Sequence, residues 1–256
     1  KGQIYQEYNI DNSNYWNSLW SKYSDKEIKR LAEINKKKND RVVKVSKKYL
    51  KKNASIIEAG CGLGQEVFKL ENAGFQVTGI DYDEGLIDRR NRLYPNAEFL
   101  HSDVSNLSSI SQKFDGYWSF GVIEHFINGY DEIANQANKV LNDEGYSFII
   151  VPTMNYLSFL KKILNVYEKK EPEKNLFHQY ILDFKHVKNV FEKNGFKYVE
   201  KHNMTGSLGA SREISMPKIF TSRSKIKLIR GLWWALNPIL SIFTWHTSLV
   251  IFKKIK

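Results

Sequence analysis

Short apolar runs and amphipathic stretches alternate along most of this chain. Residues 55–151 contain five apolar runs, each short enough for a buried strand, separated by segments whose apolar residues recur every three or four positions. A helix is predicted at 183–194, ending at Gly195, and further strands are expected at 196–202 and 247–253. Strands that alternate with helices predict an α/β fold.

The beginning of the chain has a different composition. Residues 1–24 are polar and aromatic and include Tyr15, Trp16 and Trp20, whereas residues 25–52 are rich in lysine. The second stretch has the period of one amphipathic helix. Its inward-facing residues are expected to be Ile28, Leu31, Ile34, Val42, Val43, Val45, Tyr49 and Leu50.

The most informative motif is an apolar run, 56–59, that leads into a glycine-rich turn. Gly60, Gly62 and Gly64 have the spacing G-x-G-x-G, and Glu58 precedes them by two positions. Glycines at alternate positions let the backbone pass close to a ligand, because a Cβ atom would collide there. The following helix offers N–H groups at its start. This construction is typical of a nucleotide-type cofactor site, but its spacing differs from the G-x-G-x-x-G fingerprint of dinucleotide-binding proteins.

This motif and four later segments together resemble the class I S-adenosylmethionine (SAM) methyltransferases. The later segments are a strand ending in Asp81, a strand followed by Asp103, a strand leading to Glu124 and His125, and the run 140–152. Both aspartates follow predicted parallel strands, where open α/β sheets bind ligands, although either could simply cap the next helix. Five matches in one order are more specific than any single motif.

The resemblance implies a Rossmann-like, mostly parallel sheet of seven strands in the order 3-2-1-4-5-7-6. The last strand would be antiparallel, with helices on both faces. It implies SAM as the cofactor and S-adenosylhomocysteine (SAH) as its product. Asp81 would accept hydrogen bonds from the ribose hydroxyls, Asp103 would receive the adenine amino group, and Glu58 would lie near the amino group of the methionine part. The residues expected to bind the cofactor are Glu58, Gly60, Cys61, Gly62, Gly64, Asp81, Tyr82, Asp103, Val104, Ser119, Phe120, Tyr15 and Arg41.

Two histidines are candidates for a catalytic base, because histidine can accept a hydroxyl proton at neutral pH. His125 follows the fourth strand, beside the expected methyl donor, and is the first candidate. A bracing role in this turn is an equal alternative. His178 is the second candidate, and it could equally start a helix. Arg41 is a candidate for the methionine carboxylate, with a solvated arginine as the alternative.

The predicted organisation has three parts. Residues 1–52 form a helical lead-in or lid, because several members of the family lay such a segment across the cofactor. Tyr15 and Trp16 are then expected to line the site, with the anchoring of a terminal helix to the core as an equal alternative. Residues 53–202 and 246–256 form the cofactor-binding core. Two insertions, 152–178 and 203–245, lie on the carboxyl-end side of strands five and six and are expected to form a substrate cap.

Residues 225–245 combine basic residues with an apolar run that is rich in tryptophan. This composition suits a helix packed on the domain or at a dimer contact, which is the favoured interpretation. It also suits a helix lying in a membrane interface. No apolar run approaches the length of a spanning helix, so no spanning segment is expected.

Composition narrows the function classes. The chain of 256 residues has a formal net charge of +11, one cysteine and six histidines. A single cysteine excludes a disulfide within the chain, and no histidine spacing matches a metal site, so no metal is expected. The basic excess fits scattered, solvated lysines better than a nucleic-acid surface. No signal segment is recognised, so the expected location is the cytoplasm, with the inner membrane surface as a peripheral alternative.

The sequence therefore predicts a SAM-dependent methyltransferase that acts on a small-molecule hydroxyl. The expected acceptors are a sugar, a lipid-linked compound or a quinone-type precursor. Direct in-line transfer needs mainly orientation and the exclusion of water. The alternatives are an RNA or protein methyltransferase and a SAM-binding scaffold without catalysis. A nicotinamide dehydrogenase is disfavoured by the glycine spacing.

Overall fold

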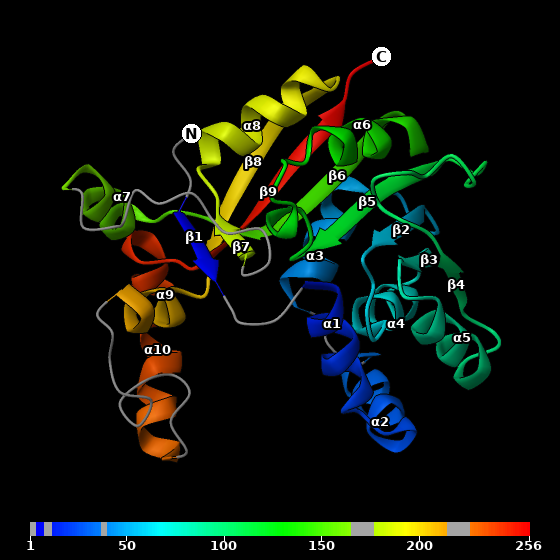
Figure 1. The fold of residues 1–256 in the computed structure, drawn as a ribbon, viewed down its shortest axis with the longest axis horizontal. Helices are drawn as coiled ribbons and strands as arrows, with labels where there is room; N and C mark the ends of the chain where they lie inside the picture. The colour runs from blue at the N-terminus through cyan, green and yellow to red at the C-terminus, as the bar shows by residue number, and fades with distance from the viewer. Residues whose placement is uncertain (1–3, 8–11, 37–39, 165–176, 214–225) are drawn as a thin grey trace.

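A computed structural model describes residues 4–7, 12–36, 40–164, 177–213 and 226–256, and Figure 1 shows their arrangement. The main sheet consists of β2 (Ser55–Ala59), β3 (Gln76–Asp81), β4 (Glu98–His101), β5 (Phe114–Phe120), β6 (Leu141–Pro152), β8 (Phe196–Met204) and β9 (Thr247–Lys254). The strands lie in the order β4-β3-β2-β5-β6-β9-β8.

The direction of the strands agrees with the sequence prediction. Neighbouring strands from β4 to β6 run parallel, whereas β9 is antiparallel to both β6 and β8. Counted along the chain within this sheet, the order is 3-2-1-4-5-7-6. The predicted order and the antiparallel last strand are therefore both confirmed.

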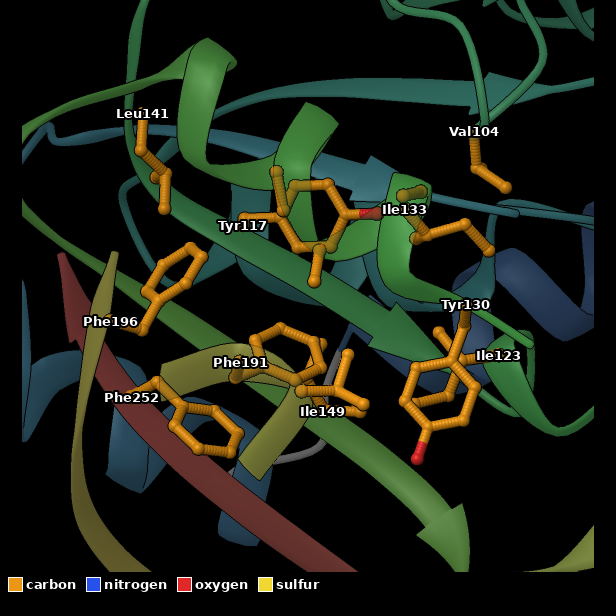
Figure 2. Close-up of a cluster of buried hydrophobic side chains, with 14 of the residues drawn as sticks. Val104, Tyr117, Ile123, Tyr130, Ile133, Leu141, Ile149, Phe191, Phe196 and Phe252 are labelled. Atoms are coloured by element: carbon orange, nitrogen blue, oxygen red, sulfur yellow. The ribbon is translucent and has the colours of Figure 1, made fainter. Parts of the chain in front are cut away.

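Helices cover both faces of the sheet. One face carries α3 (Arg41–Tyr49), α4 (Gln65–Asn72) and α5 (Glu84–Leu93), and the other carries α6 (Asp131–Val140) and α8 (Phe184–Lys193). Because side chains alternate along a strand, Tyr117 of β5 joins the α6–α8 core while its neighbour Trp118 joins the opposite core. Figure 2 shows the α6–α8 core, where Phe191 of α8 stacks on Phe252 of β9 with ring centroids 4.5 Å apart.

The predicted single helix at 25–52 is wrong, because this stretch contains α2 (Asp25–Lys36) and α3, and the residues between them include some outside the described part of the chain. Asp40 begins α3, where its carboxylate accepts the Val42 N–H. Such a cap favours a new helix start. Ile34, which was expected to face inward, is exposed.

A small second sheet was not predicted from the sequence. Its strands are β1 (Ile4–Glu7) and β7 (Phe177–Ile181), which pair antiparallel with Tyr5 opposite Tyr180. Helix α1 (Asn12–Ser21) comes next along the chain after β1. The pairing ties the aromatic lead-in to the segment that follows β6.

The two predicted insertions leave the sheet at the same edge, because the ends of β6 and β8, Pro152 and Met204, both pair with Thr247. Their described residues include α7 (Tyr156–Ile163), α9 (Gly206–Glu213) and α10 (Lys227–Phe243). These helices lie toward one side of the molecule in Figure 1. Residues 165–176 and 214–225 of the insertions lie outside the described part. Among the described helices, none has the length and apolarity needed to cross a membrane.

Candidate functional site

A cavity of about 430 Å³ lies at the carboxyl ends of the central parallel strands. Its walls come from the segments after β2, β3, β4 and β5 and from α1. The lining residues are Trp16, Trp20, Glu58, Gly60, Cys61, Gly62, Leu63, Gln65, Glu66, Asp81, Tyr82, Asp103, Val104, Phe120, Gly121, Val122, His125 and Phe126. Open α/β sheets bind small molecules at this edge, where the strand order reverses, so this cavity is the candidate site.

The glycine-rich loop after β2 forms part of the cavity wall. Gly60 (φ +79°) and Gly62 (φ +48°) both adopt left-handed backbone conformations that favour glycine. A Cβ atom on Gly60 would lie 2.5 Å from the Val122 side chain, and one on Gly62 would lie 2.9 Å from the Trp20 ring. The loop is therefore held between the turn after β5 and helix α1, with no room for a side chain at either position.

The other two loop residues play smaller parts. Gly64 precedes α4 and does not line the cavity, and a Cβ atom there would lie 2.8 Å from the Phe99 ring. Cys61 lines the cavity but is buried, and burial raises the pKa of its thiol. A protonated thiol is a poor nucleophile, so Cys61 contributes mainly a small side chain.

Glu58 is a buried carboxyl group on the cavity wall. It is 2% exposed, and its Oε2 atom has no hydrogen-bond partner, while the Val67 N–H hydrogen-bonds the carboxyl group. Burial, followed by the nearby carboxyl of Glu66, raises the pKa of Glu58 well above its usual range. A buried carboxyl is stabilised when a cationic donor reaches it. The amino group of SAM is such a donor, so this residue fits the expected cofactor.

Asp81 connects the glycine loop to β3. Its Oδ2 atom accepts the Gly62 N–H at 2.9 Å, and its Oδ1 atom accepts the Asp83 N–H at 3.2 Å. Burial raises the pKa of Asp81, and the Gly62 hydrogen bond opposes that shift. Because a carboxylate offers several lone pairs, Asp81 can hold the loop and still accept hydrogen bonds from ligand hydroxyls in the cavity.

Asp103 also combines a local role with a place on the cavity wall. Its Oδ1 atom accepts the N–H of Ser105 at 2.8 Å and the Oγ–H of the same residue at 2.7 Å. These bonds fix the turn after β4. Val104, next in the chain, lines the cavity as well. The cap interpretation and the ligand interpretation of Asp103 are therefore compatible.

The cavity is acidic although the chain is basic. Glu58, Glu66, Asp81 and Asp103 line it, and none of the described lysines or arginines does, while the whole chain carries a formal charge of +11. Carboxyl groups attract a cationic ligand and repel the pyrophosphate of a dinucleotide. The charge of the cavity therefore favours SAM over a nicotinamide cofactor, in agreement with the glycine spacing.

His125 reaches the cavity from the turn after β5, in the short helix η1 (Ile123–His125). Its Nδ1 atom lies 2.6 Å from the backbone carbonyl oxygen of His178. A carbonyl only accepts, so the ring proton is on Nδ1 and the neutral ring carries its lone pair on Nε2. Burial lowers the pKa of His125 to about 4. The ring is therefore neutral at neutral pH and also braces η1 against β7.

Aromatic rings of α1 close one side of the cavity. Trp16 meets His125 edge-on, with ring centroids 5.1 Å apart, and stacks with Trp20 at 5.6 Å. Tyr15 packs edge-on against His178 at 4.8 Å. Trp16 and Trp20 line the cavity, whereas Tyr15 and His178 do not. The lead-in therefore anchors α1 and contributes to the cavity wall.

The structure brings most of the predicted site residues to this cavity. Those that line it are Glu58, Gly60, Cys61, Gly62, Asp81, Tyr82, Asp103, Val104, Phe120 and His125. Those that do not are Tyr15, Arg41, Gly64, Ser119 and His178. Arg41 is exposed at the start of α3, and Ser119 is buried inside β5.

Trp16, which was expected to line the site together with Tyr15, does line it. Several other lining residues were not among those predicted: Trp20, Leu63, Gln65, Glu66, Gly121, Val122 and Phe126. Gln65 and Glu66 open α4 directly after the glycine loop, so the motif itself could have indicated them. Trp20 is distant from that motif along the chain, and no local pattern links it to Gly62. Only the aromatic composition of residues 1–24 indicated that Trp20 could lie in the site.

Glu124 precedes His125 but does not line the cavity. Its Oε2 atom is buried without a hydrogen-bond partner, and burial raises the pKa of Glu124 to about 8. The carboxyl is therefore protonated at neutral pH. Because the Glu124 carboxyl is neutral, no unpaired charge is buried beside the turn that carries His125.

Part of this chain is similar to a family of known proteins. Residues 57–149 match the model of a family described as a methyltransferase domain. A probable S-adenosylmethionine-dependent methyltransferase of Mycolicibacterium smegmatis is 25% identical over 142 residues, which cover 56% of this chain and 51% of that protein. This chain thus spans about half the length of that relative.

Solved structures share the fold at low sequence identity. A TehB-like SAM-dependent methyltransferase from Corynebacterium glutamicum aligns with a TM-score of 0.54 and 18% identity, over 95% of this chain and all (100%) of that one. The 1,6-didemethyltoxoflavin-N1-methyltransferase of Burkholderia thailandensis, solved with S-adenosylhomocysteine, aligns with a TM-score of 0.52 and 16% identity. That alignment covers 84% of this chain and 77% of that chain.

Replacing Glu124 with glutamine should change how stability depends on pH. The pKa of Glu124 is about 8 in the folded protein and near 4.5 when unfolded. Between these values the folded state binds the extra proton, so the wild type loses stability as pH rises through this window. The Tm of Glu124→Gln minus the Tm of the wild type should therefore increase as the pH is raised from about 5 to about 9. A Tm difference that does not vary with pH would contradict a protonated Glu124.

Asp81→Ala should weaken SAH binding on the order of a hundredfold, because two charge-assisted hydrogen bonds are lost. Isothermal titration calorimetry measures this affinity. Asp83→Ala is the matched control, since Asp83 caps α5 and does not line the cavity. Unchanged SAH affinity in Asp81→Ala, or an equal loss in Asp83→Ala, would rule out the ribose assignment.

Proposed function

We propose that this chain is a SAM-dependent methyltransferase that transfers the methyl group of SAM to a hydroxyl group of a small molecule. The acceptors that we propose are a sugar, a lipid-linked compound or a quinone-type precursor. RNA is a less suitable acceptor, because the carboxyl groups that line the cavity repel phosphate.

The observation that supports a hydroxyl acceptor is the state of His125. A hydroxyl must lose its proton as it attacks a methyl group, so a nearby base helps. His125 lies on the cavity wall, and burial lowers its pKa to about 4, so the ring is unprotonated at neutral pH although it is a weaker base than a free histidine. The Nδ1 hydrogen bond to the His178 carbonyl leaves the lone pair on Nε2, which is the atom that would take the proton.

The remaining residues bind, orient and exclude water. When bound, SAM supplies an activated methyl group on a positively charged sulfur. Glu58 would hold the amino group of SAM, and Asp81 would hold its ribose. The backbone of the glycine loop would lie against the cofactor. Trp16, Phe120 and Phe126 form apolar walls that would keep water from the acceptor. Orientation and dryness are the main requirements of direct methyl transfer, and these residues would provide both.

The comparisons leave the acceptor open. The structural neighbour from Burkholderia thailandensis is named as an N1-methyltransferase, so the fold accommodates a nitrogen acceptor in that protein. At 16% identity, this likeness does not extend to the acceptor. The hydroxyl acceptor is therefore proposed from His125 alone.

Two substitutions of His125 separate a base from a brace. His125→Ala removes both the Nε2 lone pair and the Nδ1 donor, whereas His125→Asn can keep an N–H donor close to the Nδ1 position. We expect both variants to bind SAH normally and to lose activity to a similar extent, on the order of a hundredfold. Activity is measured as SAH release from SAM with a panel of sugars and quinols as acceptors.

The contrast between the variants decides the role. Recovery of activity in His125→Asn would show that the hydrogen bond to His178 is what matters, and the base would be excluded. The pH profile gives an independent readout. The wild-type kcat/KM should stay level near neutral pH and fall only as pH approaches about 4, where His125 becomes protonated. Loss of this acid limb in His125→Asn would agree with a base.

A further inference from the structure

Helix α10 carries a stripe of exposed apolar side chains on one side and an exposed tryptophan, Trp234, on another. Among its residues, Leu228 is 82% exposed and Trp234 is 81% exposed. Leu228, Leu232 and Ile239 recur at helical spacing on one side, and Ile242 and Phe243 continue that side. An apolar stripe on a helix normally packs on the core of its own protein. An exposed one therefore indicates an interaction surface.

Helix α7 has a second exposed apolar stripe. Tyr156, Phe159, Leu160, Ile163 and Leu164 are all exposed, and they have the spacing i, i+3, i+4, i+7, i+8. These residues cover one face of the helix. Together with the exposed apolar residues of α10, they form what we call the α7–α10 surface.

The α7–α10 surface is anchored to the main sheet. Helix α10 packs closely on α9, where a Cβ atom on Gly209 would collide with the carbonyl oxygen of Thr244, the residue that ends α10. The Tyr156 ring, at the start of α7, packs edge-on against Trp245, with centroids 5.1 Å apart. Trp245 donates its indole N–H to the Thr153 hydroxyl at 2.9 Å. The end of α10 and the start of α7 are therefore fixed to the same edge of the sheet.

The charges of this surface select among possible partners. Helices α7 and α10 contain Lys161, Lys162 and Lys227, and neither contains an aspartate or a glutamate. A symmetric dimer through this surface would place basic helices against each other with no acidic residue on either helix to pair with the lysines, which is unfavourable. An anionic lipid surface instead attracts the lysines and takes up the apolar side chains. Exposed tryptophan also favours the boundary between lipid and water.

We propose that the α7–α10 surface docks on an anionic lipid bilayer, with both helices lying in the plane of the interface. Leucine, isoleucine and aromatic side chains enter the acyl boundary, and the lysines contact the lipid phosphates. The docked surface lies at the edge where β6 and β8 end, which is also the carboxyl edge of the sheet. This inference rests on the exposed surface and does not depend on the proposed acceptor.

Vesicle sedimentation tests the proposal. The full chain is incubated with vesicles of phosphatidylcholine alone or of phosphatidylcholine mixed with phosphatidylglycerol. We expect binding to the anionic vesicles, and much weaker binding to the neutral ones. The triple variant Leu228→Ser/Leu232→Ser/Ile239→Ser should bind anionic vesicles on the order of a hundredfold more weakly. Lys227→Gln should reduce binding about fivefold.

The matched control replaces three exposed apolar residues elsewhere, as Ile34→Ser/Leu100→Ser/Ile255→Ser. It should bind vesicles like the wild type. Circular dichroism and SAH titration verify that each variant is folded, so a failure of the cofactor site is seen separately. Equal vesicle binding by both triple variants, or no binding by the wild type, would overturn the proposal. A wild-type dimer that becomes monomeric in the α10 variant, without vesicle binding, would overturn it in favour of a second copy.

Discussion

The buried hydrogen bond between the Gly62 N–H and Asp81 Oδ2 joins the two loops on which the whole site depends. It fixes the glycine loop after β2 to the end of β3, in a backbone conformation that favours glycine at positions 60 and 62. With the loop fixed, Val122 and Trp20 pack directly on its backbone. The parallel sheet places these elements at one edge, and this hydrogen bond joins two of the segments that line the cavity there.

The second determinant is charge. The chain is strongly basic, but its cavity is lined by four acidic residues and, within the described part of the chain, by no lysine or arginine. Glu58 is buried with an unpartnered oxygen, which is costly unless a ligand supplies a donor. Basic residues lie instead on outer helices such as α7 and α10. This separation suits a cationic cofactor in the cavity and leaves basic side chains on the outer helices.

The sequence predicted the sheet and most of the cavity because both depend on local patterns. Apolar runs that end in Glu58, Asp81 and Asp103 mark strand ends, and parallel strands bring such ends together. The sequence did not predict contacts between distant segments. Trp20 on Gly62 and the pairing of β1 with β7 depend on how α1 folds back, and no period within either segment encodes that. The break at Asp40 was missed because a capping aspartate resembles any other polar residue of a lysine-rich helix.

A glycine loop with buried carboxyl groups should select a cationic cofactor. Calorimetric titration of the purified protein with SAM, SAH and NAD under one set of conditions measures this selectivity. SAM and SAH should bind and NAD should not, because the acidic cavity repels its pyrophosphate. Binding of NAD at an affinity equal to that of SAM, or failure of both SAM and SAH to bind, would contradict this expectation.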